Sequence, residues 1–91
     1  MKISGPELRN IIVQALLRHS RSGLAPGAVT DDTRVVGADL DLDSLRCLEA
    51  LVDIEGRLGI RLLDESLGEK ALRSVGKLVA HVQAALDRAP A

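Results

Sequence analysis

The sequence predicts an all-α fold, a four-helix bundle of three main helices and a short third helix. Apolar residues recur at helical spacing in separate stretches, and residues that favour helix ends bound each stretch. The 91-residue chain contains no Phe, Tyr or Trp, so its core must be built from Leu, Ile, Val and Ala. Aliphatic side chains of this kind suit helix–helix packing. Because 46% of the residues are hydrophobic, we expect one core and a single domain over residues 1–91.

The first helix is expected at about residues 5–20. Ser4 can accept a bond from a free backbone N–H, Glu7 can reach back to it, and Pro6 is tolerated in the first turn. Gly23 is the expected terminator. The apolar residues that follow the start keep the spacing of one helix face: Leu8, Ile11, Ile12, Ala15 and Leu16.

Residues 21–43 are expected to form a long connection, because glycine, proline and turn-forming residues interrupt any regular pattern there. A connection of this length in a small domain is usually functional or packed by its own side chains. Five aliphatic residues can supply the packing: Val29, Val35, Val36, Leu40 and Leu42.

The second helix is expected at residues 44–58, with Asp43 as its N-cap and Gly59 as its terminator. Its apolar residues form two stripes at helical spacing. The first stripe, which we assign to the core, comprises Leu51, Ile54 and Leu58. The second lies on the side of Ser44 and comprises Leu48 and Val52, with Leu45 beside them.

Two further helices complete the predicted bundle. Asp64 can cap a short helix at about residues 65–71, and Ser74 can cap the last helix at about residues 74–87. The last helix has a regular apolar face, made of Val75, Leu78, Val79, Val82 and Leu86.

Ser44 is the main candidate functional residue. Its hydroxyl is expected in the first turn of a helix, beside the Asp43 carboxylate, and neither His19 nor His81 lies near it in sequence. A serine without a base is poorly equipped to attack a substrate, which argues against a serine hydrolase. It is well placed to be modified by another protein. Cys47, one turn away, is interpreted as a small packed residue.

The segment from residue 39 to residue 60, DLDLDSLRCLEALVDIEGRLGI, resembles the acyl carrier protein family. The family pattern is an acidic loop with spaced apolar residues, then Asp-Ser-Leu, then a helix that ends in an apolar residue, Gly and Ile. The residues that match it are Ser44, Leu45, Glu49, Leu58, Gly59 and Ile60. The expected order of helices along the chain agrees with the same family.

The resemblance implies a carrier that is not an enzyme. A phosphopantetheinyl transferase would move 4′-phosphopantetheine from coenzyme A to Ser44, and Asp43 would assist the transferase and its metal ion. The thiol of the arm would hold acyl groups as thioesters and present them to acyl-activating, condensing and tailoring enzymes. A docking patch on the second helix is expected at Leu45, Arg46, Leu48, Glu49 and Val52.

Two positions depart from the family pattern. Asp41 stands where the family usually has glycine, and Arg46 stands where carriers of primary fatty acid biosynthesis usually have an acidic residue. The second helix therefore has a net charge of only −1. We expect partners with mixed or apolar contact faces, as in a dedicated polyketide, hybrid or lipid pathway.

Two alternatives remain: an aminoacyl or peptidyl carrier with the same arm, and a helical interaction module that is never modified. The net charge of −1 argues against a nucleic-acid partner, and no apolar run predicts membrane insertion. The first residues lack the apolar run of a signal peptide. We therefore expect a cytoplasmic monomer.

Overall fold

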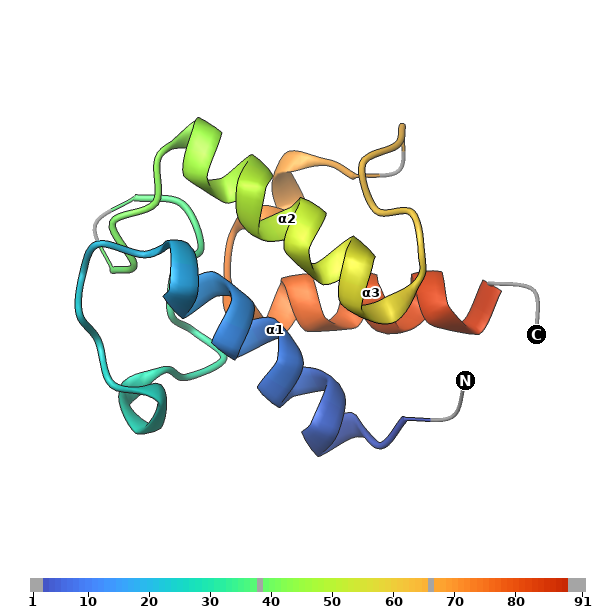
Figure 1. Ribbon diagram of the computed structural model, residues 1–91, viewed down its shortest axis with the longest axis horizontal. Coiled ribbons are helices and arrows are strands. Elements are labelled where there is room, and N and C mark those ends of the chain that lie inside the picture. Colours follow the sequence, from blue (N-terminus) through green and yellow to red (C-terminus); the bar gives the residue numbers. More distant parts are fainter. Residues whose placement is uncertain (1–2, 38, 66, 89–91) are drawn as a thin grey trace.

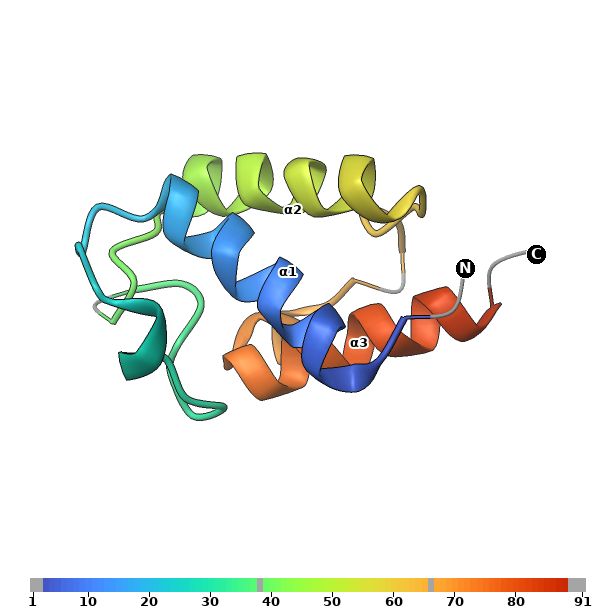
Figure 2. The ribbon, with the colours of Figure 1, turned by 60° about the horizontal axis from the view of Figure 1, so that its bottom comes forward.

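The computed structural model describes residues 3–37, 39–65 and 67–88. Across these residues there are three α-helices and two short 3₁₀-helices, and no strand beyond one isolated antiparallel bridge between Gly37 and Leu42. The elements are α1 (Gly5–His19), η1 (Pro26–Ala28), α2 (Ser44–Leu58), η2 (Glu69–Leu72) and α3 (Val75–Arg88). Figure 1 shows their arrangement, and Figure 2 shows α1 crossing obliquely between α2 and α3. The predicted all-α class is confirmed.

α1 begins as its sequence predicts but ends earlier. The Ser4 hydroxyl accepts a bond from the Glu7 backbone N–H at 3.1 Å, and it also donates to the Glu7 carboxylate at 3.2 Å. The expected terminator, Gly23, is wrong, because the helix ends at His19 with Ser20 as its C-cap. The backbone of Ser20 is extended, with φ −79° and ψ 145°, which ends the helix before Gly23 is reached. The Ser20 hydroxyl donates to the Leu40 carbonyl.

α2 has the predicted bounds. The Asp43 carboxylate accepts a bond from the backbone N–H of Arg46 at 2.8 Å, which satisfies one free donor of the first turn. At the other end, Gly59 adopts a left-handed conformation with a φ of 66°. The N–H groups of Gly59 and Ile60 both bond the Glu55 carbonyl, at 2.8 and 3.3 Å. This geometry requires a positive φ and explains the glycine.

The third helix differs from its prediction. We expected residues 65–71 to follow an Asp64 cap, but the structure has only a four-residue 3₁₀-helix, η2, whose N-cap is Gly68. The Leu67 N–H bonds the Asp64 carbonyl at 3.1 Å, so the chain makes a turn after Asp64 and not a helix. Ser66 lies outside the described residues.

A contact from α2 holds the chain just before this turn. The Glu55 carboxylate accepts bonds from the backbone N–H groups of Leu62, at 2.6 Å, and Leu63, at 2.9 Å. These bonds tie the segment after α2 back to that helix. The last helix starts one residue later than expected, with the Ser74 hydroxyl accepting the Lys77 N–H at 3.3 Å.

The core is aliphatic, as predicted. Its largest fully buried side chains come from all three α-helices and from both connections: Leu8, Ile12, Leu16, Val35, Leu40, Leu51, Ile54, Leu62, Val75, Leu78 and Val82. Each buried side chain of this size contributes about 1.5–3 kcal/mol relative to exposure. Val36 is the exception among the loop residues expected to pack, because its side chain is 40% exposed.

The long connection is tied to α1 and α3. Arg9 donates to the Val29 carbonyl at 3.1 Å and to the Asp31 carboxylate at 3.2 Å. The backbone N–H of Gly76 bonds the Asp31 carbonyl at 3.0 Å. A Cβ at Gly76 would lie 3.0 Å from the Asp31 Cβ, so this close approach needs glycine. The connection is therefore a packed part of the fold.

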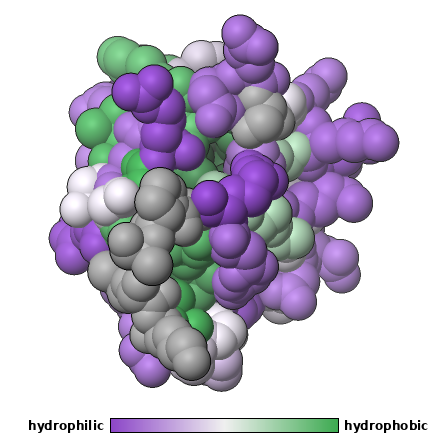
Figure 3. Space-filling view, turned by 90° about the vertical axis from the view of Figure 1, so that its right-hand side faces the viewer, coloured by the Kyte–Doolittle hydropathy of each residue, from purple (hydrophilic) through white to green (hydrophobic). Residues whose placement is uncertain are grey.

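The surface mixes charged and apolar groups. Figure 3 views the end of the molecule at which α2 and α3 finish, where hydrophobic atoms show between hydrophilic side chains. Among the described residues, no helix has the length and apolar character needed to cross a membrane.

Candidate functional site

Ser44 is the first residue of α2 and is exposed. Within the described chain its hydroxyl makes no hydrogen bond, whereas the neighbouring Asp43 carboxylate is occupied as the helix cap. The free N–H groups of a helix start surround this position and favour a negatively charged group there. The geometry leaves the Ser44 oxygen open to an external reagent. Figure 1 shows α2, which begins at this residue.

No base activates Ser44 in the part of the chain that the structure describes. His19 lies at the end of α1, and its Nε2 is 3.3 Å from the Asp53 carboxylate. His81 lies on α3, and its buried Nε2 has no hydrogen-bond partner among the described residues. Neither imidazole bonds Ser44, so the arrangement of a serine hydrolase is not formed.

The loop before Ser44 alternates between buried and exposed residues. Leu40 and Leu42 are buried at 0% and 2% exposure, while the side chains of Asp39 and Asp41 are exposed. The backbone N–H of Gly37 bonds the Leu42 carbonyl at 3.2 Å and supports this path. The two leucines therefore anchor the loop and leave its carboxylates in solvent near Ser44.

Asp41 has a φ of 49°, in the left-handed region that favours glycine. It occupies the position where the family pattern has glycine. Asp41 in place of the family's glycine is compatible with this left-handed backbone, because a short polar side chain tolerates that conformation.

The exposed side of α2 carries an apolar strip. Leu45, Leu48 and Val52 are 65%, 45% and 51% exposed, and Glu49 is exposed between them. With the half-buried Arg46, these are the five residues of the docking face predicted from the sequence, and that role stays a prediction. Large apolar groups exposed together mark an interaction site more often than single ones do.

A hollow of about 660 Å³ adjoins the docking face at the end of α1. Its lining joins two helices: Arg18, His19, Leu48, Glu49, Val52 and Asp53. Arg46 also connects the two helices, because its Nη1 donates to the His19 carbonyl at 3.3 Å. A cation at a helix carboxyl end is favourable, so Arg46 also stabilises the end of α1.

Asp53 is a functional-site neighbour that the sequence reasoning missed. Its carboxylate lies 3.0 Å from Arg18, 3.3 Å from His19 and 2.8 Å from Arg57. Burial alone would raise the pKa of Asp53, but the hydrogen bonds from Arg57, Arg18 and His19 outweigh it and hold that pKa below its ordinary value. Only the Arg57 contact, four residues along one helix, is visible in sequence.

Cys47 lies one turn from Ser44 but packs into the core. It is 3% exposed, and burial raises the pKa of its thiol. A buried thiol with a raised pKa is a poor nucleophile. The interpretation of Cys47 as a packing residue agrees with this position.

Several acyl carrier proteins are similar to this sequence over about two thirds of its length. The chain is 42% identical over 62 residues to the acyl carrier protein of Rhodococcus erythropolis, a match that covers 68% of this chain and 65% of that protein. It is 40% identical over 62 residues to the meromycolate extension acyl carrier protein of Mycolicibacterium aurum, with 68% of this chain and 61% of that protein covered.

A third relative is covered more completely. The acyl carrier protein of Renibacterium salmoninarum is 36% identical over 67 residues, which cover 74% of this chain and 79% of that relative. The chain belongs to the acyl carrier protein family. This acyl carrier protein matches less than two thirds of the length of the Rhodococcus and Mycolicibacterium relatives. No family model matches the chain, and no solved structure does.

Proposed function

We propose that this acyl carrier protein holds acyl groups as thioesters on a 4′-phosphopantetheine arm attached to Ser44, and presents them to partner enzymes without catalysing a reaction itself. The observation that carries the proposal is the exposed, unbonded hydroxyl of Ser44 at the start of α2 in a member of this family. The protein would thereby become a phosphoprotein with a single tether point.

The local electrostatics suit a phosphodiester at Ser44. A helix amino terminus stabilises a negative group by about 0.3–1 kcal/mol at an exposed site. Asp43 opposes this through like-charge repulsion, but its carboxylate is already bonded to the Arg46 N–H and is screened by water. The arm supplies the thiol chemistry, and the protein supplies position.

Asp43 is proposed to assist the phosphopantetheinyl transferase and its metal ion during attachment. Its exposed carboxylate sits directly beside Ser44. The residue retains its capping bond, so recognition and helix capping are compatible.

The docking face is proposed to meet the acyl-activating, condensing and tailoring enzymes. It offers Leu45, Leu48 and Val52 as exposed apolar contacts, with only Glu49 as an acidic residue among them. Such a face fits partners with mixed or apolar surfaces better than strongly basic ones. This supports a dedicated polyketide, hybrid or lipid pathway, and one relative is by name a carrier of meromycolate extension.

Intact mass spectrometry tests the attachment. The protein is incubated with coenzyme A and a broad-specificity phosphopantetheinyl transferase, and one arm per chain is expected. Ser44→Ala should gain no mass, whereas Ser22→Ala, which removes another exposed serine, should gain it fully. An unmodified wild type, or a Ser44→Ala variant that is still loaded, would support an unmodified interaction module.

Cargo loading separates the acyl carrier from an aminoacyl or peptidyl carrier. The holo protein is offered to purified acyl-activating and amino-acid-adenylating enzymes in separate reactions. We expect acyl thioesters to accumulate, detected by mass, and their loss on treatment with hydroxylamine. Loading by amino acids alone would contradict the acyl assignment.

A further inference from the structure

The hollow beside the docking face is a feature that attachment of the arm does not use. It has a volume of about 660 Å³ and lies where the end of α1 meets the exposed side of α2 (Figure 2). Leu48 and Val52 give it an apolar surface, and they are 45% and 51% exposed. An apolar side chain of another molecule can therefore be buried against them.

The charged groups at this hollow present their positive charge outward. The Asp53 side chain is only 20% exposed, and its carboxylate is paired with Arg18 at 3.0 Å and Arg57 at 2.8 Å. The two arginine side chains are 42% and 50% exposed. The carboxylate is thus neutralised beneath two cations that remain accessible to a partner.

Arg46 adds a third cation beside the hollow. Its Nη1 donates to the His19 carbonyl at 3.3 Å, and the rest of its guanidinium group keeps donors for an external acceptor. Glu49 is exposed and forms no ion pair within the described chain, so it is the one carboxylate of the hollow that opposes a negative partner. Positive charge exceeds negative charge here, although the whole chain has a net charge of −1.

We propose that this hollow is the contact site for an acidic partner surface. It receives one apolar side chain of a partner enzyme, and carboxylates that flank that side chain pair with Arg18 and Arg46. The inference rests on the function proposed above and names the chemistry of the partner. A basic partner surface would meet like charge at the same place and would be disfavoured.

The apolar and charged parts of the hollow have different effects. Burial of an apolar side chain against Leu48 and Val52 holds the complex together. Exposed pairs between arginine and a carboxylate are individually weak, with a factor of about 1.5–5 in binding for each. They act mainly on the association rate and on the choice of partner. The resulting contact is weak and reversible, which suits a carrier that must leave each enzyme.

Two synthetic peptides serve as probes of the partner's charge. Both form an amphipathic helix with one stripe of leucine, and the flanking positions carry glutamate in one peptide and lysine in the other. Each is titrated into the ¹⁵N-labelled protein. We expect the glutamate peptide to shift the backbone amide signals of Arg18, Leu48 and Val52, and to bind about 2- to 25-fold more tightly than the lysine peptide. The difference should shrink in about 0.5 M NaCl, because salt screens exposed charges.

Variants assign the preference to individual side chains. Arg18→Gln and Arg46→Gln should each weaken binding of the glutamate peptide about 1.5- to 5-fold. Glu49→Gln should strengthen it by a similar factor, because it removes a like charge. Leu48→Ser should weaken both peptides alike, since it removes apolar surface and no charge. Far-UV circular dichroism melts verify that each variant is folded.

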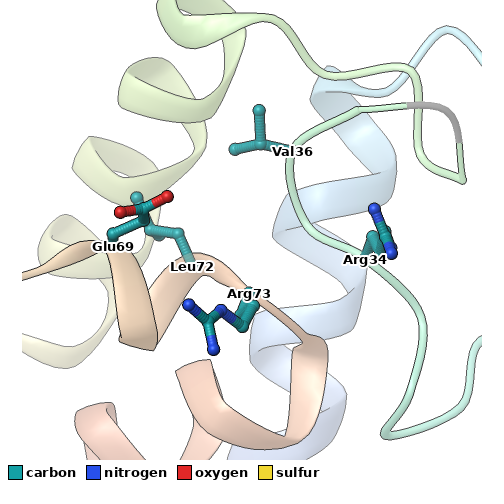
Figure 4. Close-up of a pocket in the computed structure, with 5 residues that line it drawn as sticks. All are labelled: Arg34, Val36, Glu69, Leu72 and Arg73. Atoms are coloured by element: carbon teal, nitrogen blue, oxygen red, sulfur yellow. The ribbon is translucent and has the colours of Figure 1, made fainter.

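A second charged pocket supplies the matched control. It has a volume of about 480 Å³ and lies between the long connection and η2, where Figure 4 shows Arg73 among its lining residues. None of the residues that line it also lines the hollow. Arg73 is exposed, so Arg73→Gln removes the same charge from a different surface. This variant should bind the glutamate peptide as the wild type does.

The outcomes separate the partner's charge from the carrier function. Equal binding of both peptides, tighter binding of the lysine peptide, or no shift at the hollow with either peptide would overturn the proposal. Signals of the hollow that change with protein concentration alone would show that a second copy of the chain occupies it, which also overturns it. The titrations use protein without the arm, so they do not depend on Ser44. A Ser44 that gains no mass would overturn the carrier function alone.

Discussion

The two sides of α2 have similar apolar residues and opposite environments. Leu51 and Ile54 are 2% and 0% exposed, whereas Leu48 and Val52 are 45% and 51% exposed. The difference arises from what covers them, because α1 packs on one side and no described element covers the other (Figure 2). One helix therefore contributes to the core and to the proposed docking face, and substitutions on its two sides should have separable effects.

The largest expected effect is a loss of stability on the buried side. Ile54→Ala removes a fully buried side chain and leaves a cavity, so the free energy of unfolding should fall by about 2–5 kcal/mol. Val52→Ala on the exposed side should change it by about 0.5 kcal/mol or less. Urea titrations followed by far-UV circular dichroism measure both, since the chain has no Trp or Tyr for fluorescence. Similar losses for the two variants would contradict the comparison.

Two glutamates of α2 allow a second comparison, between a carboxylate that bonds the backbone and one that is exposed. Glu55 accepts the N–H groups of Leu62 and Leu63, and Glu55→Ala leaves them unpaired, at an expected cost of about 1.5–3 kcal/mol. Glu49→Ala removes an exposed carboxylate and should stay within about 0.5 kcal/mol of the wild type. Equal effects in the same urea titrations would show that Glu55 does not organise the segment after α2.

Asp53 stands at the boundary between the two sides, and its contribution should depend on pH. Its pKa is lower in the folded protein than in the unfolded chain. Its stabilisation is therefore complete above the unfolded value of about 3.9 and is lost as the pH falls through the folded pKa. Asp53→Asn should cost about 1 kcal/mol at pH 7. The gap between the melting temperatures of wild type and variant should narrow below pH 4, and a gap that stays constant down to pH 2 would contradict this.

The smallest expected effect concerns the loop that precedes Ser44 and α2. Asp41 has a positive φ, so Asp41→Gly should relieve strain and stabilise the fold by a few tenths to about 1 kcal/mol. Asp39→Gly is the control, because Asp39 has no positive φ and its carboxylate bonds the Arg34 N–H. It should destabilise the protein. Destabilisation by both glycines would show that Asp41 is not strained.

Local chemistry made α2 and the candidate site predictable. Asp43 and Gly59 contact backbone groups only a few residues away, so short segments of sequence are enough to predict their capping roles. The spacing of Leu51, Ile54 and Leu58 separates the buried side of the helix from that of Leu48 and Val52 before any contact is known. The exposed position of Ser44 followed from its place in the first turn, directly after the Asp43 cap.

Contacts between distant segments were not predictable. The bonds from Glu55 to Leu62 and Leu63 cross from a helix to the chain beyond it, which leads to the short η2 in place of the helix expected at residues 65–71. The cations around Asp53 come largely from α1, more than 30 residues earlier, because α1 and α2 pack together. No local pattern encodes either contact.

Helix periodicity and capping depend on near neighbours. They were sufficient to place Ser44 in the exposed first turn of α2 and to divide that helix into a buried and an exposed side. Packing decided the rest: where α1 stops, how short η2 is, which cations surround Asp53, and that Arg34 and Arg73 line one pocket. The reason is physical. Hydrogen bonds within a turn are determined by adjacent residues, whereas contacts between distant segments depend on how whole elements pack around one core.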